Sequence, residues 1–252
     1  MTSDAPRFFV GGCEDQRLPY MVLRSSILGR CPQADVRFLC DYEVDGETPR
    51  PRKKSDRPRT QFSFQRFLIP KLCGYQGCAV YLDSDMLVFG DPLDLWQHDF
   101  RGGVASPPED SRGAQFAVML IDCERARWDI VDLIARMDAN KLDYRGLMDM
   151  RFERVSASLS QKWNCLDWMD DSTKLLHFTD MTKQPWVRKC HPLRGVWESA
   201  LEEAMRRDDT GKVVECFVGG LGTALRPSLS SLLGAEASDY GFVPPYMRWR
   251  RK

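Results

Sequence analysis

Residues 78–91 constrain the fold more than any other stretch of the chain. An apolar run ends at two carboxylates one residue apart, Asp83 and Asp85, and a second apolar run begins immediately after them. A continuous run of β-branched and large apolar residues is typical of a buried strand in a parallel sheet. Because open α/β sheets bind ligands beyond the carboxyl ends of their strands, we expect the acidic pair to lie at a binding site.

The acidic pair is a candidate metal site. In an extended chain the side-chain period is two, so Asp83 and Asp85 project from the same edge. Two hard oxygen donors at such a short separation suit Mn²⁺ or Mg²⁺ better than a soft metal. The alternative is that the carboxylates cap the turn after the strand, since Asp and Ser are common turn residues. An Asp-x-Asp sequence by itself does not separate these two interpretations.

The N-terminal segment is typical of a nucleotide-binding fold. A strand over residues 7–12 ends in Gly11 and Gly12, a helix is expected over 18–30, and a second strand over 36–39. This order opens a doubly wound α/β fold. The glycines allow the backbone to approach a ligand closely. The dinucleotide fingerprint is absent, so a nicotinamide or flavin cofactor is not predicted.

Strand and helix patterns alternate through the remainder of the chain, which predicts an α/β protein. Apolar periodicity and turn residues predict the following elements: helices over 61–73, 91–96, 124–139, 143–152 and 193–207, and strands over 102–106, 115–122 and 174–177.

A second polar group of residues follows the last of these strands. The strand delivers His177 to a polar turn, with Lys183 six positions later and a Pro-Trp corner behind it. A lone histidine is usually structural, but this one emerges at a strand end, as the acidic pair does. An imidazole can complete an oxygen-rich Mn²⁺ site, and an ammonium group can neutralise phosphate oxygens. Trp186 is either a core residue or a flat surface for a sugar ring.

Two segments are strongly basic. Residues 48–60 carry six basic residues and three prolines, which predicts a mobile surface loop. This loop is either a lid or patch for an anionic acceptor, or a solvated insertion. Residues 244–252 interleave aromatic and basic residues, a pattern that suits peripheral contact with an anionic membrane. A disordered tail is the alternative.

Composition excludes several classes of protein. The formal net charge is zero, so no general attraction to nucleic acid is predicted. No apolar segment reaches the roughly 20 residues that span a bilayer, and the N-terminus lacks the pattern of a secretory signal. The nine cysteines form no Cys-x-x-Cys pair, so we expect reduced thiols in a cytoplasmic protein.

The acidic strand at residues 81–88 and the later His177, Lys183 and Pro-Trp corner together resemble the family 8 glycosyltransferases. These are retaining, metal-dependent enzymes of the GT-A fold, a Rossmann-like single domain with a mixed, mainly parallel sheet flanked by helices. The resemblance implies a nucleotide-sugar-binding and catalytic domain over residues 1–190. Residues 191–252 would form a helical extension packed on the same domain.

The resemblance also assigns roles to particular residues. The implied ligands of Mn²⁺ or Mg²⁺ are Asp83, Asp85 and His177. The implied catalytic residues are Asp83, Asp85, Lys183 and Gln115, of which Lys183 contacts the distal phosphate and Gln115 falls near the sugar-binding segment. The implied donor-binding residues are Gly11, Gly12, Cys13, Arg66, Asp83, Ser84 and Lys183. Gln184 separates Lys183 from the Pro-Trp corner, so Gln184 is the alternative counterpart of the family's lysine, and Asn164 matches the Trp-Asn pair of the family.

The expected activity is transfer of a hexosyl group from a nucleotide diphosphate sugar, with UDP as the expected nucleotide, to a glycan or other hydroxyl acceptor. Two alternatives remain open at this stage: a sugar-phosphate nucleotidyltransferase, and an inactive nucleotide-sugar-binding module. Arg66 either makes a surface salt bridge or contacts the phosphate or sugar of the donor. The sequence predicts no oligomeric state.

Overall fold

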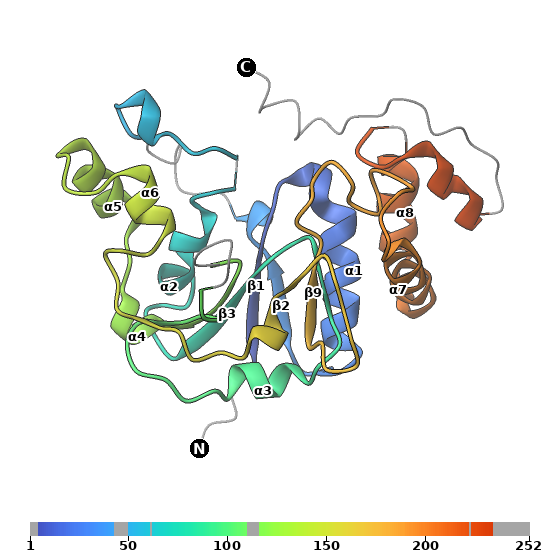
Figure 1. The fold of residues 1–252 in the computed structure, drawn as a ribbon, viewed down its shortest axis with the longest axis horizontal. Helices are drawn as coiled ribbons and strands as arrows, with labels where there is room; N and C mark the ends of the chain where they lie inside the picture. Colours follow the sequence, from blue (N-terminus) through green and yellow to red (C-terminus); the bar gives the residue numbers. More distant parts are fainter. Residues whose placement is uncertain (1–4, 43–49, 61, 110–115, 222, 234–252) are drawn as a thin grey trace.

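The computed structural model describes residues 5–42, 50–60, 62–109, 116–221 and 223–233 (Figure 1). Its centre is a six-stranded sheet with the strand order β2-β1-β3-β6-β5-β7. The strands of this sheet are β1 (Arg7–Gly11), β2 (Asp35–Phe38), β3 (Cys78–Asp83), β5 (Val104–Ala105), β6 (Val118–Asp122) and β7 (Val155–Ser156). β1 pairs parallel with β2 and β3, whereas β6 pairs antiparallel with β3 and β5. The predicted mixed α/β sheet is therefore confirmed.

A second, three-stranded sheet lies beside the first. It has the order β4-β9-β8 and consists of β4 (Met86–Val88), β9 (Leu175–His177) and β8 (Cys165–Leu166). β3 ends at Asp83 in the large sheet and β4 begins at Met86 in the small one. The two apolar runs of the sequence are thus strands of two different sheets, and the acidic pair occupies the junction between them.

Helices cover both faces of the large sheet (Figure 1). On one side, α1 (Arg17–Leu28) contacts α7 (Arg194–Arg207) and α8 (Lys212–Gly220). The other helices are α2 (Ile69–Leu72), α3 (Pro92–Trp96), α4 (Cys123–Ala126), α5 (Ile130–Asp138) and α6 (Tyr144–Met148). Of these, α2, α4, α5 and α6 lie on the face opposite α1. None of the helices in the described part of the chain is long and apolar enough to cross a membrane.

Several expected helices are shorter than the sequence pattern suggested. The pattern over 61–73 becomes a 3-10 turn, η4 (Gln65–Leu68), followed by α2, with Pro70 at the start of α2. The pattern over 124–139 is split between α4 and α5. Arg127 has a left-handed backbone (φ 40°), which ends α4, and Asp129 caps α5 by accepting a hydrogen bond from the Val131 N–H at 2.7 Å. Apolar periodicity continues across this break because both helices pack on the same core.

Further 3-10 turns connect these elements: η1 (Glu14–Gln16), η2 (Leu39–Asp41), η3 (Lys54–Asp56), η5 (Gln161–Trp163) and η6 (Pro227–Leu233). The expected strand over 115–122 starts at Val118, and Gln115 lies outside the described residues. The basic tail at 244–252 and the beginning of the basic loop at 48–60 also lie outside them.

Candidate metal and donor site

The acidic pair is held by backbone hydrogen bonds to three neighbouring segments. The Asp83 N–H donates to the carbonyl of Ala117, which precedes β6, at 3.2 Å, and the Ser84 N–H donates to the Gly11 carbonyl at the end of β1 at 3.1 Å. The Asp85 carbonyl accepts from the N–H of Phe178, the residue after β9, at 2.9 Å. The turn between the two sheets is therefore fixed from both sheets, and its carboxylates have defined positions.

The structure brings His177 to the acidic pair. One ligand atom from each of Asp83, Asp85 and His177 lies within 4.8 Å of the other two. The Nε2 atom of His177 is 3.2 Å from Oδ1 of Asp85. His177 is the last residue of β9 and pairs with Met86 of β4, so the small sheet places the imidazole beside the turn. We call these three residues the acidic-histidine cluster.

Asn164 orients the imidazole of His177. The Nδ1 atom of His177 is 3.0 Å from Oδ1 of Asn164. An amide oxygen only accepts hydrogen bonds, so Nδ1 carries the hydrogen and Nε2 faces the carboxylates. Metal-ligating histidines are commonly fixed in this way by a polar partner on the other ring nitrogen. Two carboxylates and one oriented imidazole fit a hard or borderline cation such as Mn²⁺.

Buried groups surround Asp83. The Tyr81 hydroxyl donates to Oδ1 of Asp83 at 2.5 Å, and a terminal nitrogen of Arg66 is 3.6 Å from the same oxygen. Arg66 also donates to the Phe116 carbonyl at 2.8 Å, and its guanidinium lies 4.5 Å from the centre of the Tyr81 ring. Arg66 is buried, so the alternative that it makes a salt bridge on the surface is wrong. Its contact with a donor stays a prediction.

The pKa values of Asp83 and His177 are both raised above their ordinary values. Burial raises the pKa of the Asp83 carboxyl, Arg66 opposes this effect, and the neighbouring Asp85 reinforces it. Burial by itself lowers the pKa of His177, but the Asp85 and Asp83 carboxylates together outweigh burial and raise it. A divalent cation would compete with these protons for the same atoms.

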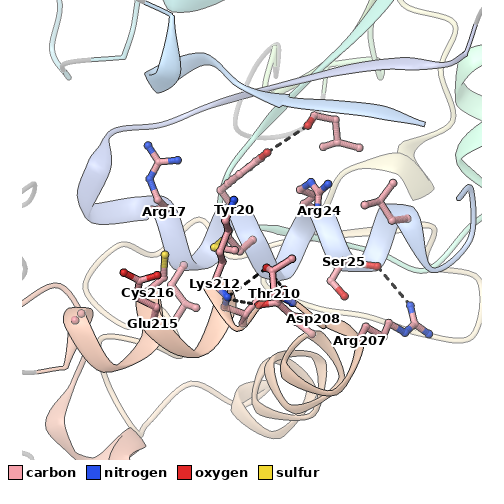
Figure 2. Close-up of a pocket in the computed structure, with 18 of the residues that line it drawn as sticks. Arg17, Tyr20, Arg24, Ser25, Arg207, Asp208, Thr210, Lys212, Glu215 and Cys216 are labelled. Carbon is pink, nitrogen blue, oxygen red and sulfur yellow. Dashed lines mark hydrogen bonds between the residues drawn. The ribbon is translucent and has the colours of Figure 1, made fainter. Parts of the chain in front are cut away.

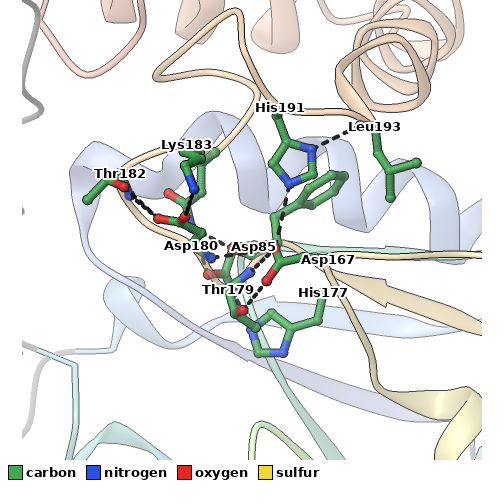
Figure 3. Close-up of polar contacts among 11 residues, drawn as sticks. Asp85, Asp167, His177, Thr179, Asp180, Thr182, Lys183, His191 and Leu193 are labelled. Carbon is green, nitrogen blue, oxygen red and sulfur yellow. Dashed lines mark hydrogen bonds and ion pairs between the residues drawn. The ribbon is translucent and has the colours of Figure 1, made fainter.

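Gln184, and not Lys183, contacts the cluster. The Gln184 side chain is fully buried, and its amide nitrogen donates to Oδ2 of Asp85 and to the Phe178 carbonyl, both at 2.9 Å. The Lys183 side chain is 57% exposed and its ammonium lies 3.0 Å from the Asp180 carboxylate (Figure 3). Gln184 is thus the residue of this pair that contacts Asp85, and its correspondence to the family's lysine stays a prediction. Lys183 remains a predicted phosphate contact.

A second polar network, which sequence reasoning missed, borders the cluster (Figure 3). Asp167 donates its backbone N–H to the His177 carbonyl at 2.9 Å, and its carboxylate accepts hydrogen bonds from the N–H (2.8 Å) and hydroxyl of Thr179. Nε2 of His191 is 3.6 Å from the same carboxylate. Asp167 has a left-handed backbone, with φ at 61°. Nothing in the local sequence separates it from other acidic loop residues, since its role depends on long-range contacts.

The structure decides between the two interpretations of Trp186 and exposes a second tryptophan that the sequence analysis did not single out. Trp186 is fully buried, with its ring 5.9 Å from that of Phe178 and 5.2 Å from that of Trp197. The sugar-surface interpretation of Trp186 is therefore wrong. Trp168, the residue after Asp167, is 53% exposed. A signal was present in the sequence, because Trp168 interrupts an acidic loop rather than an apolar run.

The residues that are expected to contact the nucleotide lie at the junction of the two sheets, on the side of β1. A side chain on Gly11 would collide with the Tyr81 hydroxyl, and one on Gly12 would approach Phe38 at 2.8 Å. Cys13 is buried, and burial raises the pKa of its thiol to about 11, so it is no ready nucleophile. The Ser84 hydroxyl oxygen is buried and has no hydrogen-bond partner among the described residues.

A cavity of about 1280 Å³ lies away from the acidic-histidine cluster (Figure 2). It is a groove between α1, α7 and α8, and none of the acidic-histidine residues lines it. One of the charged residues that line it, Arg17, lies 2.7 Å from Glu14 and 2.5 Å from Asp41.

The sheet order and the acidic turn define a GT-A type of α/β domain. No family model matches the chain. Over 90 residues it is 32% identical to Protein CDI of Arabidopsis thaliana, a match that covers 35% of each protein. The match thus spans about a third of that curated relative.

Solved structures share the fold over most of the chain. The glycosyltransferase GlyE of Streptococcus pneumoniae has a TM-score of 0.60 at 18% identity, covering 86% of this chain and 64% of GlyE. WbbM, a bifunctional glycosyltransferase, has a TM-score of 0.61 at 14% identity, covering 86% and 52%. The galactosyltransferase LgtC, solved with donor and acceptor sugar analogues, has a TM-score of 0.57 at 13% identity, covering 85% and 100%. At these identities the likeness establishes the GT-A fold alone.

Proposed function

We propose that the protein is a metal-dependent, retaining glycosyltransferase. It transfers a hexosyl group from a nucleotide diphosphate sugar, with UDP as the expected nucleotide, to the hydroxyl of a glycan or other acceptor. The observation that carries the proposal is the convergence of Asp83, Asp85 and His177 within 4.8 Å on a fold shared with GlyE, WbbM and LgtC. The free state of the described cysteines supports a reducing, cytoplasmic location.

The chemical difficulty of the proposed reaction is the departing diphosphate, which accumulates negative charge as the anomeric bond breaks. A Mn²⁺ or Mg²⁺ ion supplies fixed positive charge for that leaving group when it is bound. Asp83, Asp85 and His177 would hold the ion. Each ligand has its own supporting group: Tyr81 for Asp83, Gln184 for Asp85, and Asn164 for His177. Such supporting contacts orient metal ligands and raise their affinity.

The remaining assignments belong to the donor and the acceptor. Lys183 would leave Asp180 to contact the distal phosphate, while Gly11, Gly12 and Cys13 face the base. Gln115 is assigned to the donor sugar. The exposed Trp168 gives the acceptor side an aromatic surface, since the C–H face of a sugar stacks on such rings. Retention of anomeric configuration would follow from same-face attack assisted by the leaving phosphate.

The decisive experiment is a panel of nucleotide sugars with Mn²⁺, measured as release of nucleoside diphosphate. We expect turnover with at least one donor, and a loss of about 100-fold or more in Asp85→Ala. Asp132→Ala is the matched control, because Asp132 is an exposed carboxylate on α5 away from the cluster. Equal turnover in Asp85→Ala and the control would refute the proposed role of the cluster.

Three further measurements separate the alternatives. The anomeric configuration of the product, measured by NMR, distinguishes retention from inversion, and an inverted product would contradict the proposed mechanism. Release of pyrophosphate from a sugar phosphate and a nucleoside triphosphate would instead identify a nucleotidyltransferase. Binding of a nucleotide sugar without turnover, including slow hydrolysis, would identify an inactive binding module.

A further inference from the structure

The basic loop of the sequence is an anchored part of the molecule. Its turn η3 contacts α6 and lies near α5 (Figure 1). Asp56 is 4% exposed and accepts a hydrogen bond from the Tyr144 N–H at 3.3 Å. The Arg52 N–H donates to the carboxylate of the last residue of α5 at 2.8 Å, and the Arg59 guanidinium lies 5.1 Å from the centre of the Tyr144 ring. These contacts contradict the expectation of a mobile loop for its described part.

Together with α5 and α6, the loop encloses a cavity of about 400 Å³. Four cationic side chains line it: Lys53, Arg136, Lys141 and Arg151. They come from separate parts of the chain, namely the loop, helix α5, the connection between α5 and α6, and the segment after α6. We call this cavity the basic cleft. Its volume lies within the range of small-ligand sites, of order 300–1,000 Å³.

Two of the four cations are already paired with carboxylates: Lys53 lies 3.7 Å from Asp56, and Arg151 lies 2.8 Å from Asp149. Asp56 accepts from the backbone of Tyr144, and Asp143 accepts from the Gly146 N–H at 2.6 Å as the cap of α6. Among the described residues, neither Arg136 nor Lys141 forms an ion pair with a carboxylate. The positive charge that the described carboxylates leave unpaired in the cleft is therefore that of Arg136 and Lys141.

The chemistry of the basic cleft selects an anion with several oxygens. Two cations without a carboxylate partner that share one cavity repel each other, and a bound anion removes that cost. The guanidinium fork matches the spacing of phosphate oxygens, and lysine adds a compact positive charge. We infer that the basic cleft binds a phosphate group, carried by a soluble molecule or by a lipid headgroup. This inference does not depend on the proposed transferase activity.

The test uses full-length protein kept free of metal with EDTA, so that the acidic-histidine cluster cannot recruit phosphate through a cation. Inorganic phosphate and pyrophosphate are titrated, binding is followed by calorimetry and by Tm, and sodium chloride at equal ionic strength is the reference. We expect both anions to raise Tm beyond the chloride effect. In the double variant Arg136→Gln/Lys141→Gln, affinity should fall about tenfold or more.

The matched control is Lys71→Gln/Arg101→Gln, which removes the same charge from exposed positions outside the basic cleft. The control should bind phosphate as the wild type does. If the cleft variant fails to fold, the single variant Lys141→Gln replaces it, because Lys141 is exposed. Equal affinity in the cleft and control variants, or no stabilisation beyond chloride, would overturn the inference.

Vesicles distinguish the two sources of phosphate. Phosphatidylcholine vesicles with and without phosphatidic acid are sedimented with the wild type and with Arg136→Gln/Lys141→Gln. Co-sedimentation that requires phosphatidic acid and is lost in the cleft variant identifies a lipid headgroup. Binding of soluble phosphate without vesicle binding identifies a soluble phosphorylated ligand. Vesicle binding that persists in the cleft variant, with unchanged phosphate affinity, contradicts the basic cleft as the site.

Discussion

The carboxylate of Asp85 has a fixed orientation because Gln184, a fully buried amide, donates to it. In Gln184→Met, which has a similar volume but no donor, we expect the free energy of unfolding to fall by about 1–3 kcal/mol, since a buried acceptor loses its partner. The affinity for Mn²⁺ should fall about tenfold, as for other losses of ligand-orienting contacts. Chemical denaturation and calorimetry with Mn²⁺ measure the two effects.

The control for this change is Gln76→Met, at an exposed position outside the site. Gln76→Met should alter neither the free energy of unfolding nor the affinity for Mn²⁺. If Gln184→Met lowered stability but left Mn²⁺ affinity unchanged, Gln184 would have a packing role and no role in orienting Asp85.

Trp168 tests the acceptor side of the proposed function. Trp168→Ala removes the exposed ring that follows Asp167 in the chain, so from its proposed acceptor role we expect the KM for a saccharide acceptor to rise about tenfold. Hydrolysis of the donor to free sugar should be unchanged, because water needs no aromatic surface. Kinetics with a panel of neutral disaccharides measure the transfer, and Val218→Ala, at an exposed apolar position on α8, is the control. An equal loss of hydrolysis and transfer would show that Trp168 supports the fold instead.

At the scale of the elements, the site depends on how closely β1 and β3 approach each other. Gly11 at the end of β1 pairs with Asp83 at the end of β3, and the missing side chain leaves room for the Tyr81 hydroxyl that holds Asp83. A glycine is needed here for space and not for an unusual backbone angle, because the φ angle of Gly11 does not lie in the positive region that favours glycine.

Gly11→Ala should therefore destabilise the protein by about 1–3 kcal/mol through overpacking, and it should weaken Mn²⁺ binding because Tyr81 is displaced. Gly195→Ala is the matched control: nothing lies within 4 Å of an added side chain there, and its place in α7 favours alanine by about 0.5–1 kcal/mol. Thermal unfolding with and without Mn²⁺ measures both. A stable Gly11→Ala protein with wild-type Mn²⁺ affinity would disprove the close-approach argument.

At the scale of the whole molecule, Arg226 ties the C-terminal segment to the site. It is 2% exposed, its Nε donates to the Pro185 carbonyl at 2.8 Å, and its backbone N–H donates to the Trp186 carbonyl at 2.7 Å. Its guanidinium also pairs with Glu198 of α7. The corner that carries Gln184 is thus held by residues from both α7 and the segment before η6.

Glu198→Ala removes the carboxylate that pairs with the buried Arg226, so we expect the free energy of unfolding to fall by about 3 kcal/mol. Glu202→Ala, an exposed change on the same helix, should stay within about 0.5 kcal/mol of the wild type. Urea unfolding measures both values. Equal stability of the two variants would mean that the Arg226 pair contributes nothing to the attachment of the C-terminal segment.

Local sequence pattern predicted most elements of the fold because periodicity, caps and glycines act within a few residues. The strand that ends at Asp83 and the Asp91-capped start of α3 follow from such signals. Helix lengths were overestimated where a left-handed residue, such as Arg127, interrupts a continuous apolar face.

In the candidate site, too, some features follow from local sequence signals and others from long-range contacts. The sequence alone placed Asp83, Asp85 and His177 at strand ends, because alternation and apolar runs are local properties of the chain. Only the tertiary structure decided that Gln184 contacts Asp85, that Trp186 is core while Trp168 is exposed, and that the basic loop encloses a cavity. Those features arise from packing between segments distant in the sequence, and no local pattern encodes which of two neighbouring side chains faces the site.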